Sequence, residues 1–461
     1  MSDKEMVRWT LIEASEKIRS REISPVDLVK AYLEAIERKD SDLNSFITVT
    51  GELALEQARA AEREIMDGRY RGELHGIPVA LKDIIDTAGV RTTSGSKILA
   101  HSVPGEDAQV WAQLREAGCV LIGKANLHEF ARGSTTDNPH YGRCYNPWDP
   151  TKSRIPGGSS GGSGAAAAAC LCAGALGTDT MGSVRKPAAR CGIVGIKPTY
   201  DRVSRQGVTP LSWSLDHVGP MARTVVDAAT MLSAMLDPAA PSGGILPKDI
   251  VPPQEVSVKG TRVGLVKGWW DAHCDEEVGS VFRRALDALM ELGCEVQEVE
   301  FPYMDKIFAA GRVVSICEAA SFHEHWIRER FEDYGEDVRN SMLAGFLIPA
   351  RDYIHCLRVR AWGIKKFHEL FSRVDVLVSP TTKEPAPKFE EAKGVEFAIY
   401  TGPAAFIGLP AVSVPCGFSG YGIPIGLQVM APHYRDDVAI RVARAYEAAT
   451  DWSQQRPPVC G

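Results

Sequence analysis

Gly157-Gly158-Ser159-Ser160-Gly161-Gly162-Ser163-Gly164 is the most unusual segment of this 461-residue chain, and an Ala-rich stretch, 165–175, follows it directly. A Gly/Ser run by itself is typical of a flexible linker. A linker is rarely followed at once by residues of a buried helix. We therefore expect a buried, Ala-rich core helix over 165–175, and the linker interpretation is disfavoured.

The same segment also matches G-x-S-x-G, the turn that carries the nucleophile of α/β-hydrolases, over Gly157–Gly161. That turn needs a strand directly before it and an acid and a histidine after it. Seven histidines follow, so the pattern stays open, but residues 147–156 predict a loop. An α/β-hydrolase would depend on one of these histidines and not on a lysine.

Helical and extended patterns alternate on both sides of this segment, which predicts an α/β layer architecture. Ser24-Pro25 is a typical helix start. A Pro-, Gly- and Asp-rich stretch over 236–260 predicts a surface connection. The spacing predicts helices at 24–38, 52–66, 108–117, 276–292, 303–331, 350–372 and 435–449. It predicts strands at 77–81, 120–123, 262–267, 294–301, 375–379, 411–416 and 425–430.

The composition excludes several classes of protein. Hydrophobic residues make up 44% and charged residues 24%, which rules out a disordered chain. The net charge of −7 and the lack of a basic cluster argue against direct nucleic-acid binding or a membrane surface. The eleven cysteines are scattered without a metal-like C-x-x-C pair, which is typical of reduced cysteines in a cytoplasmic protein.

Five more segments accompany the Gly/Ser run in a fixed order. They are Gly76-Ile-Pro-Val-Ala-Leu-Lys82-Asp83, Gly177-Thr-Asp-Thr-Met-Gly-Ser183-Val-Arg185, Gly192-Ile-Val-Gly-Ile-Lys-Pro-Thr199, Ser214-Leu-Asp-His-Val-Gly-Pro220 and Leu409-Pro-Ala-Val-Ser-Val-Pro415. Together they resemble the amidase signature family of serine hydrolases over nearly the whole chain. The resemblance implies one α/β/α domain over 1–461 with a mixed β-sheet core flanked by helices. An N-terminal helical part (about 1–70) and a more variable part (about 236–400) that shapes the substrate pocket are expected within it.

The resemblance also implies a Ser–Ser–Lys triad, with Ser183 as nucleophile, Ser159 as bridging serine after a cis peptide bond, and Lys82 as general base. Ser160 and Arg185 are expected to brace the site. A lysine must be desolvated to act as a base at neutral pH, and Lys82 ends an apolar run. No metal or cofactor is required. The backbone N–H groups expected in the oxyanion hole belong to Thr180, Met181, Gly182 and Ser183.

Met181 departs from the family pattern, which has Gly-Gly-Ser at the nucleophile. If that first glycine needs a positive φ, methionine strains the loop. If it does not, the thioether projects into the substrate pocket.

The expected function is hydrolysis of the carbon–nitrogen bond of a neutral amide, anilide or carbamate, by an amidase or a urethanase. The alternatives are a glutaminase subunit of a tRNA-dependent amidotransferase and a catalytically weak family member that acts as a binding subunit. Arg360 aligns with an arginine of the glutamine site, but Ala398 stands where its aspartate is expected, which disfavours free glutamine. The expected partner is a small-molecule substrate, and the chain is expected to be a monomer or homodimer. The substrate-binding candidates are Gly133, Ser134, Thr135, Arg360, Tyr400, Phe406 and Ile407.

Overall fold

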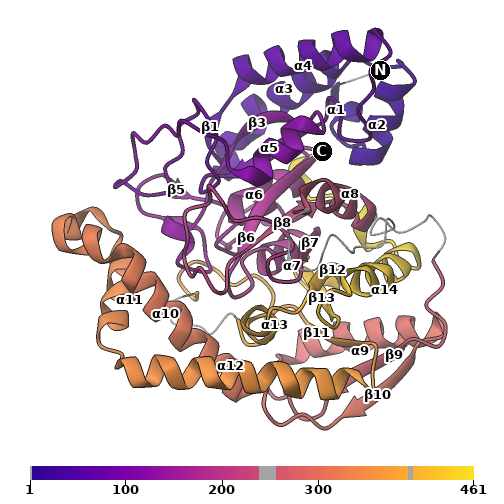
Figure 1. The fold of residues 1–461 in the computed structure, drawn as a ribbon. Helices are drawn as coiled ribbons and strands as arrows, with labels where there is room; N and C mark the ends of the chain where they lie inside the picture. The colour runs from indigo at the N-terminus through magenta and orange to yellow at the C-terminus, as the bar shows by residue number, and fades with distance from the viewer. Residues whose placement is uncertain (1–2, 238–255, 393–397, 461) are drawn as a thin grey trace.

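An eleven-stranded mixed β-sheet runs through the protein (Figure 1), and the computed structural model describes residues 3–237, 256–392 and 398–460. The strand order is β1-β3-β2-β6-β8-β7-β12-β13-β11-β9-β10, and β4 and β5 form a separate two-stranded ribbon. The strands are β1 (Phe46–Val49), β2 (Pro78–Lys82), β3 (Val120–Ala125), β4 (Asp137–Asn138), β5 (Gly142–Arg143), β6 (Gly174–Asp179), β7 (Val194–Lys197), β8 (His217–Ala222), β9 (Arg262–Val266), β10 (Glu295–Val299), β11 (Val376–Pro380), β12 (Ala411–Phe418) and β13 (Pro424–Met430).

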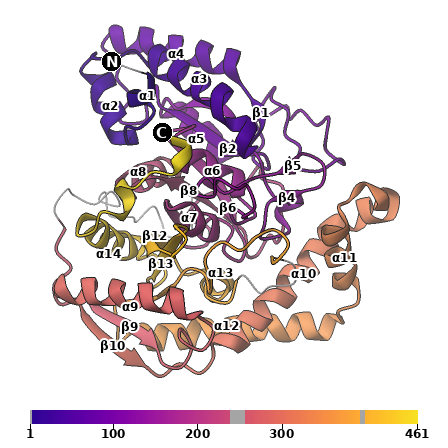
Figure 2. The ribbon, with the colours of Figure 1, turned by 180° about the vertical axis from the view of Figure 1, so that it is seen from behind.

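Helices flank this sheet and complete the single α/β domain that the sequence predicts (Figures 1 and 2). They are α1 (Asp3–Met6), α2 (Leu11–Arg19), α3 (Pro25–Leu43), α4 (Gly51–Met66), α5 (Gln109–Glu116), α6 (Gly161–Ala168), α7 (Arg185–Cys191), α8 (Val225–Met235), α9 (Glu276–Glu291), α10 (Met304–Glu329), α11 (Glu336–Phe346), α12 (Ala350–Phe371), α13 (Gly402–Ile407) and α14 (Asp436–Ala448). Short 3-10 turns lie between or after them, namely η1 (Glu129–Ala131), η2 (Phe331–Asp333), η3 (Trp452–Gln454) and η4 (Pro458–Cys460).

β2, the strand that ends with Lys82, is the middle strand of a parallel group within the sheet. β2 pairs in parallel with both β3 and β6, and every residue of β2 is buried. Strands that are buried on both faces consist of continuous apolar runs, which explains why β2 could be predicted from the sequence. At the other end of the sheet, β9, α9 and β10 form the predicted β-α-β unit with parallel strands.

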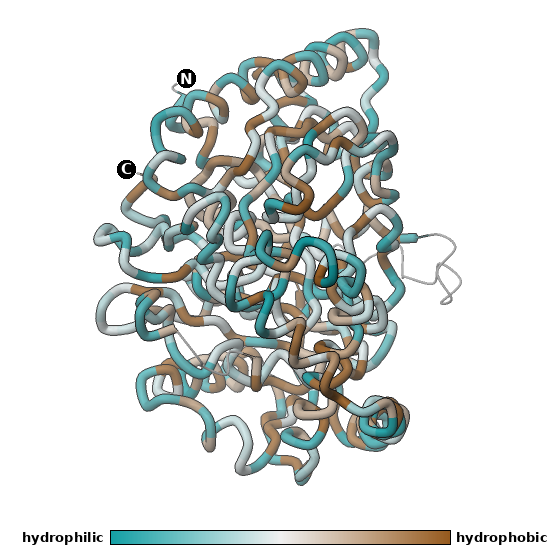
Figure 3. Tube along the Cα trace, turned by 90° about the vertical axis from the view of Figure 1, so that its left-hand side faces the viewer, coloured by the Kyte–Doolittle hydropathy of each residue, from teal (hydrophilic) through white to brown (hydrophobic). Residues whose placement is uncertain are grey.

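The most hydrophobic segments lie inside and the hydrophilic ones mostly in the outer turns and helices (Figure 3). α6 has no polar face and is buried along its whole length between its neighbours. The two larger apolar clusters of the described residues lie around β2, β3, β6 and α8, and under α10, α12 and α13. Among the described residues, no helix is both long and apolar enough to cross a membrane.

Several boundaries differ from the sequence prediction. α6 begins at Gly161, not at residue 165, and ends at Ala168, while Gly174–Asp179 is a strand. The glycines permit this early start, since a Cβ at Gly162 would lie 2.4 Å from the Asn126 carbonyl oxygen. α11 was not predicted. The predicted connection over 236–260 falls mostly outside the described residues.

Candidate active site

Lys82, the last residue of β2, has a fully buried side chain. Its Nζ donates hydrogen bonds to the Oγ of Ser159 and to the Oγ1 of Thr178, both at 2.7 Å. Burial lowers the pKa of Lys82 to about 7, while the carboxylates of Asp216 and Asp179 act in the opposite direction. A large share of the molecules therefore holds a neutral amine near pH 7, which is the form a general base requires.

The turn before α6 presents its two serines in different directions. Ser159 follows a cis peptide bond from Gly158, and its hydroxyl faces Lys82. The Oγ of Ser160 instead accepts from the N–H of Thr178 and donates to the carbonyl of Thr178, both at 3.2 Å. The described residues 147–156 contain no strand, so the strand-turn-helix arrangement of an α/β-hydrolase is absent and that alternative is wrong.

Asp179, at the end of β6, holds the loop that carries Ser183. Its carboxylate accepts hydrogen bonds from the backbone N–H of Gly182 at 2.6 Å and of Val184 at 3.2 Å. The guanidinium of Arg185 donates to the same carboxylate at 2.9 and 3.0 Å. Burial would raise the pKa of Asp179, but the charge of Arg185 holds that pKa well below its ordinary value. Arg185 thus braces the loop, as the resemblance implies.

The same arginine connects the loop to the far side of the site. Its Nη1 donates to the Oε1 of Gln428 at 2.6 Å, and the Nε2 of Gln428 donates to the carbonyl of Tyr400 at 2.9 Å. Gln428 lies on β13, and Tyr400 precedes α13. A buried, satisfied polar network of this kind holds three separate segments in one geometry.

Gly182 and Met181 differ in what their backbone requires. Gly182 has a φ of +121°, and a Cβ there would lie 2.1 Å from the Oγ1 of Thr401. Met181 is not among the residues with positive φ, so the methionine causes no left-handed strain. Its carbonyl accepts from the Thr401 hydroxyl at 2.7 Å, and its side chain lines the cavity. The second expectation for this departure, a thioether that projects into the pocket, therefore holds.

The expected oxyanion hole needs one correction. The N–H of Gly182 already donates to Asp179 at 2.6 Å, so it is not available to a substrate oxygen. Within the described part of the chain, the N–H groups of Thr180, Met181 and Ser183 make no hydrogen bond. These three N–H groups are the donors that the loop offers to a developing negative charge.

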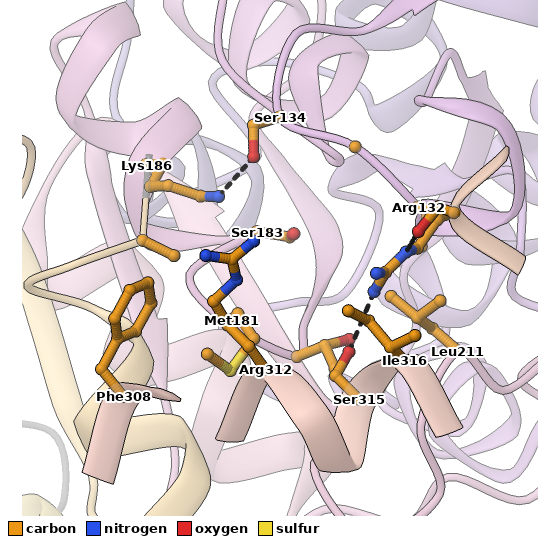
Figure 4. Close-up of a pocket in the computed structure, with 15 residues that line it drawn as sticks. Arg132, Ser134, Met181, Ser183, Lys186, Leu211, Phe308, Arg312, Ser315 and Ile316 are labelled. Atoms are coloured by element: carbon orange, nitrogen blue, oxygen red, sulfur yellow. Dashed lines mark hydrogen bonds between the residues drawn. The ribbon is translucent and has the colours of Figure 1, made fainter. Parts of the chain in front are cut away.

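A cavity of about 340 Å³ lies over Ser183, whose side chain is 6% exposed (Figure 4). The loop before α7 forms one wall and α10 the opposite wall. Among the described residues, the Ser183 hydroxyl has no hydrogen-bond partner. A hydroxyl that faces a cavity without a fixed partner is placed to meet a substrate carbonyl.

Only part of the predicted substrate-binding set lines this cavity. Gly133 and Ser134 do, whereas the Oγ1 of Thr135 turns away and pairs with the Nδ1 of His128 at 3.2 Å. Arg360 lies over the rings of Tyr200 and Phe406, at 5.4 and 5.8 Å from the ring centres. It is therefore a packing residue in this structure.

The aromatic and aliphatic candidates near α13 belong to the core. Tyr400, Phe406 and Ile407 are 1%, 0% and 2% exposed, and none of them lines the cavity. The hydroxyl of Tyr400 donates to the carbonyl of Trp270 at 2.5 Å. These three substrate-binding candidates therefore do not line the cavity, because they pack into the second apolar cluster.

Three basic residues in the cavity lining were missed. Lys186 donates to the Oγ of Ser134 at 2.8 Å, and Arg132 and Arg312 lie across the cavity from it (Figure 4). Lys186 comes three residues after Ser183, close to one helical turn, which was a usable signal. Arg312 lies on α10, about 130 residues after Ser183, and no sequence pattern places it near the site.

Comparisons with known proteins agree with this geometry. The sequence profile of the family described as Amidase matches residues 27–439. A relative from a Synechococcus species, one subunit of its glutamyl-tRNA(Gln) amidotransferase, is 38% identical over 95% of this chain and 92% of the relative. A solved structure from a vestigial protein complex, reported to reveal the evolutionary origins of an s-triazine catabolic enzyme, superposes with a TM-score of 0.89 at 33% identity, over 95% of this chain and 98% of the other. A second solved structure, an amidase, gives a TM-score of 0.87 at 32% identity, over 95% and 99%. With this match over most of its length, and with Lys82 and Ser159 hydrogen-bonded beside the loop that carries Ser183, the chain belongs to the amidase family of enzymes that hydrolyse carbon–nitrogen bonds.

Proposed function

We propose that this protein hydrolyses an amide through an acyl-enzyme on Ser183, with Ser159 and Lys82 as the proton relay. The observation that carries the proposal is the 2.7 Å hydrogen bond between the buried Nζ of Lys82 and the Oγ of Ser159, beside a cavity into which Ser183 opens. Serine is a poor nucleophile until a base takes its proton, and a buried lysine with a lowered pKa is such a base.

In the first half-reaction, neutral Lys82 takes the proton of Ser159 while Ser159 takes that of Ser183. The Ser183 oxygen attacks the amide carbon, and the resulting oxyanion faces the N–H groups of Thr180, Met181 and Ser183. As the carbon–nitrogen bond breaks, the relay runs in reverse and protonates the departing amine. Water then attacks the ester carbonyl by the same route, releases the acid and restores Ser183.

The part of the chain over 236–400 is proposed to shape the substrate pocket. Within its described residues, α10 contributes Phe308, Arg312, Ser315 and Ile316 to the wall of the cavity, and α11 contributes Ser341. The catalytic chemistry would thus come from the loops around β2 and β6, and α10 and α11 would contribute to the selectivity. A cytoplasmic location and a monomeric or homodimeric state stay predictions.

A glutaminase subunit of a tRNA-dependent amidotransferase is the second candidate, favoured by the name of the Synechococcus relative. Free glutamine carries an ammonium group, and the described residues that line the cavity include no carboxylate to pair with it. Ala398 itself is one of those lining residues. This candidate predicts ammonia release from glutamine that depends on partner chains.

The test measures amine or ammonia release from an acyl nitroanilide, a matched aryl carbamate and glutamine, by wild-type protein and by Ser183→Ala. We expect release by wild type only, and an acyl mass adduct on Ser183 when the reaction is quenched early. The ratio of anilide to carbamate rates separates an amidase from a urethanase. Equal activity of Ser183→Ala would contradict the nucleophile assignment, and a folded but inactive wild type would support the alternative of a non-catalytic binding protein.

A further inference from the structure

The cavity over Ser183 is basic. Three cationic side chains, Arg132, Lys186 and Arg312, line it, and no acidic residue of the described chain does. Their charged ends are directed toward the middle of the cavity from different sides (Figure 4). A cavity with this balance of charge disfavours a cationic ligand and favours an anionic one.

Arg132 has hydroxyl partners and no carboxylate partner. Its Nε donates to the Oγ of Ser341 at 2.7 Å and its Nη1 donates to the Oγ of Ser315 at 3.1 Å, and no ion pair forms with a described residue. Burial and the neighbouring charge of Arg312 lower the pKa of Arg132 to about 10, so the group stays charged at neutral pH. A guanidinium has five N–H donors, so donors remain for a bound carboxylate.

Lys186 is the second cation of this kind. Its Nζ donates to the Oγ of Ser134 at 2.8 Å, and among the described residues it has no ion-pair partner. Burial and the charge of Arg190 lower the pKa of Lys186 to about 7, against the opposing effect of Asp179. A bound anion would stabilise the ammonium form and draw a proton onto Lys186.

We propose that the substrate is a small amide that carries a carboxylate, which Arg132 and Lys186 bind while the amide carbonyl lies at Ser183. This inference rests on the proposed function and names the substrate class of the same site. Lys186 is 2% exposed and has no ion-pair partner among the described residues. A buried cation without a counter-ion is costly, and an anionic substrate removes that cost when it is bound. The cavity of about 340 Å³ has room for a short carboxylate-bearing chain.

The first experiment compares matched amides by ammonia release. The anionic set is malonamate, succinamate and glutaramate, and the neutral set is butyramide and succinamate methyl ester. A charge-assisted contact to a buried cation contributes about 1.5–3 kcal/mol, so we expect kcat/KM about 10- to 100-fold higher for the best anionic amide. Glutamine differs from glutaramate only by its α-ammonium group, and we expect glutaramate to be the better substrate.

Two variants test which residues cause the preference for anionic over neutral amides. Arg132→Gln and Lys186→Gln should each raise KM for the anionic amide about 10-fold or more and leave the neutral amide within about 3-fold. Arg328→Gln is the matched control, because Arg328 lies on the same helix as Arg312 and its side chain is 73% exposed. Equal or faster hydrolysis of the neutral set, or equal losses on both sets, would overturn the proposal while leaving the Ser183 mechanism intact.

A binding measurement tests the anion site independently of the proposed hydrolytic function. Calorimetric titration of Ser183→Ala with succinamate, in two buffers of different ionisation enthalpy, reports both affinity and proton uptake. We expect binding with net proton uptake, and loss of that uptake in the Ser183→Ala/Lys186→Gln double variant. If wild type hydrolyses no amide but succinamate still binds in this way, the anion site stands and the proposed function fails. If succinamate does not bind, the anion site is wrong.

Discussion

The Nζ of Lys82 lies 2.7 Å from the Oγ of Ser159, and neither side chain has exposed surface. A lysine in this position has lost its hydration shell and has only hydroxyl partners, which is the arrangement that favours its neutral form. Ser183 is the member of the proposed triad with access to the cavity. The base is thus buried beneath the cavity while the nucleophile faces it.

Lys82→Ala should lower kcat about 10²- to 10⁴-fold, the range typical of a removed general base. The measurement is the initial rate of amine release at pH 8, with thermal unfolding to show that the variant is folded. Lys97→Ala serves as control, because Lys97 is exposed and forms an ion pair with Asp333 at 2.7 Å. Full activity of a folded Lys82→Ala protein would remove Lys82 from the mechanism.

The activity should depend on pH with an apparent pKa near 7. Lys82 must be neutral to accept a proton, so kcat/KM for a neutral amide should rise as pH increases through about 7 and level off above it. The measurement is a rate profile from pH 5 to 9.5. Because the pKa of Lys186 is also near 7, the profile is repeated with Lys186→Gln, in which the rise should persist. A profile that stays flat between pH 6 and 8 would contradict the assignment.

Gly182→Ala should lower kcat at least about 10-fold and destabilise the fold by about 1–3 kcal/mol, the range for a strained backbone position. The positive φ of Gly182 is unfavourable for alanine, and the new Cβ would collide with Thr401. Urea unfolding and initial rates measure the two effects. Gly105→Ala, where nothing lies within 4 Å of the added Cβ, should leave both unchanged. A neutral Gly182→Ala would show that the loop relaxes freely.

Arg185→Met should destabilise the protein by about 3–5 kcal/mol, because it leaves the buried charge of Asp179 without its partner. The exposed pair of Arg143 and Asp137 is the control, with 43% and 38% side-chain exposure. Arg143→Met should cost no more than about 1 kcal/mol. Denaturant unfolding of both variants gives the comparison, and equal losses would argue against a bracing role for Arg185.

Met181→Gly should keep kcat for a small amide within about 5-fold, since Met181 adopts an ordinary backbone conformation. Removal of the thioether enlarges the cavity, so kcat/KM for a bulkier acyl group should increase relative to a small one. A series of nitroanilides with acyl chains of increasing size measures this ratio. An unchanged ratio would mean that Met181 does not limit substrate size.

The sequence predicted those parts of the fold whose pattern is local. β2 and the β9-α9-β10 unit were predicted close to their observed bounds, because buried strands and amphipathic helices have their own periodicity. β6 was hidden, because Gly174-Ala175-Leu176-Gly177 continues the small-residue pattern of α6 without a break. Small residues pack well both in a helix and in a strand wherever neighbouring backbone approaches closely. Only the tertiary structure therefore distinguishes α6 from β6.

The candidate site likewise contains residues that could be predicted from the sequence and residues that could not. Lys82, Ser159 and Ser183 were predicted from segments that resemble a known family. The charge of the cavity could not be predicted, because Arg132, Lys186 and Arg312 come from three segments that meet only in the folded protein. Tyr400 and Phe406 were predicted to bind substrate but belong to the core. Apolar residues near a catalytic loop occur in cores and in pockets alike, and sequence alone does not distinguish them.

The sheet order places β10 at one edge, with a neighbour on one side only. An edge strand offers unpaired N–H and C=O groups to any other chain that approaches. On β10, Glu295 and Glu298 are exposed beside this edge, together with Gln297. Two copies that approached edge to edge would bring these carboxylates together, and the repulsion opposes strand addition. The charge on this rim of the sheet therefore disfavours edge-to-edge association of two copies, at a place remote in the strand order from the strands that carry the candidate site.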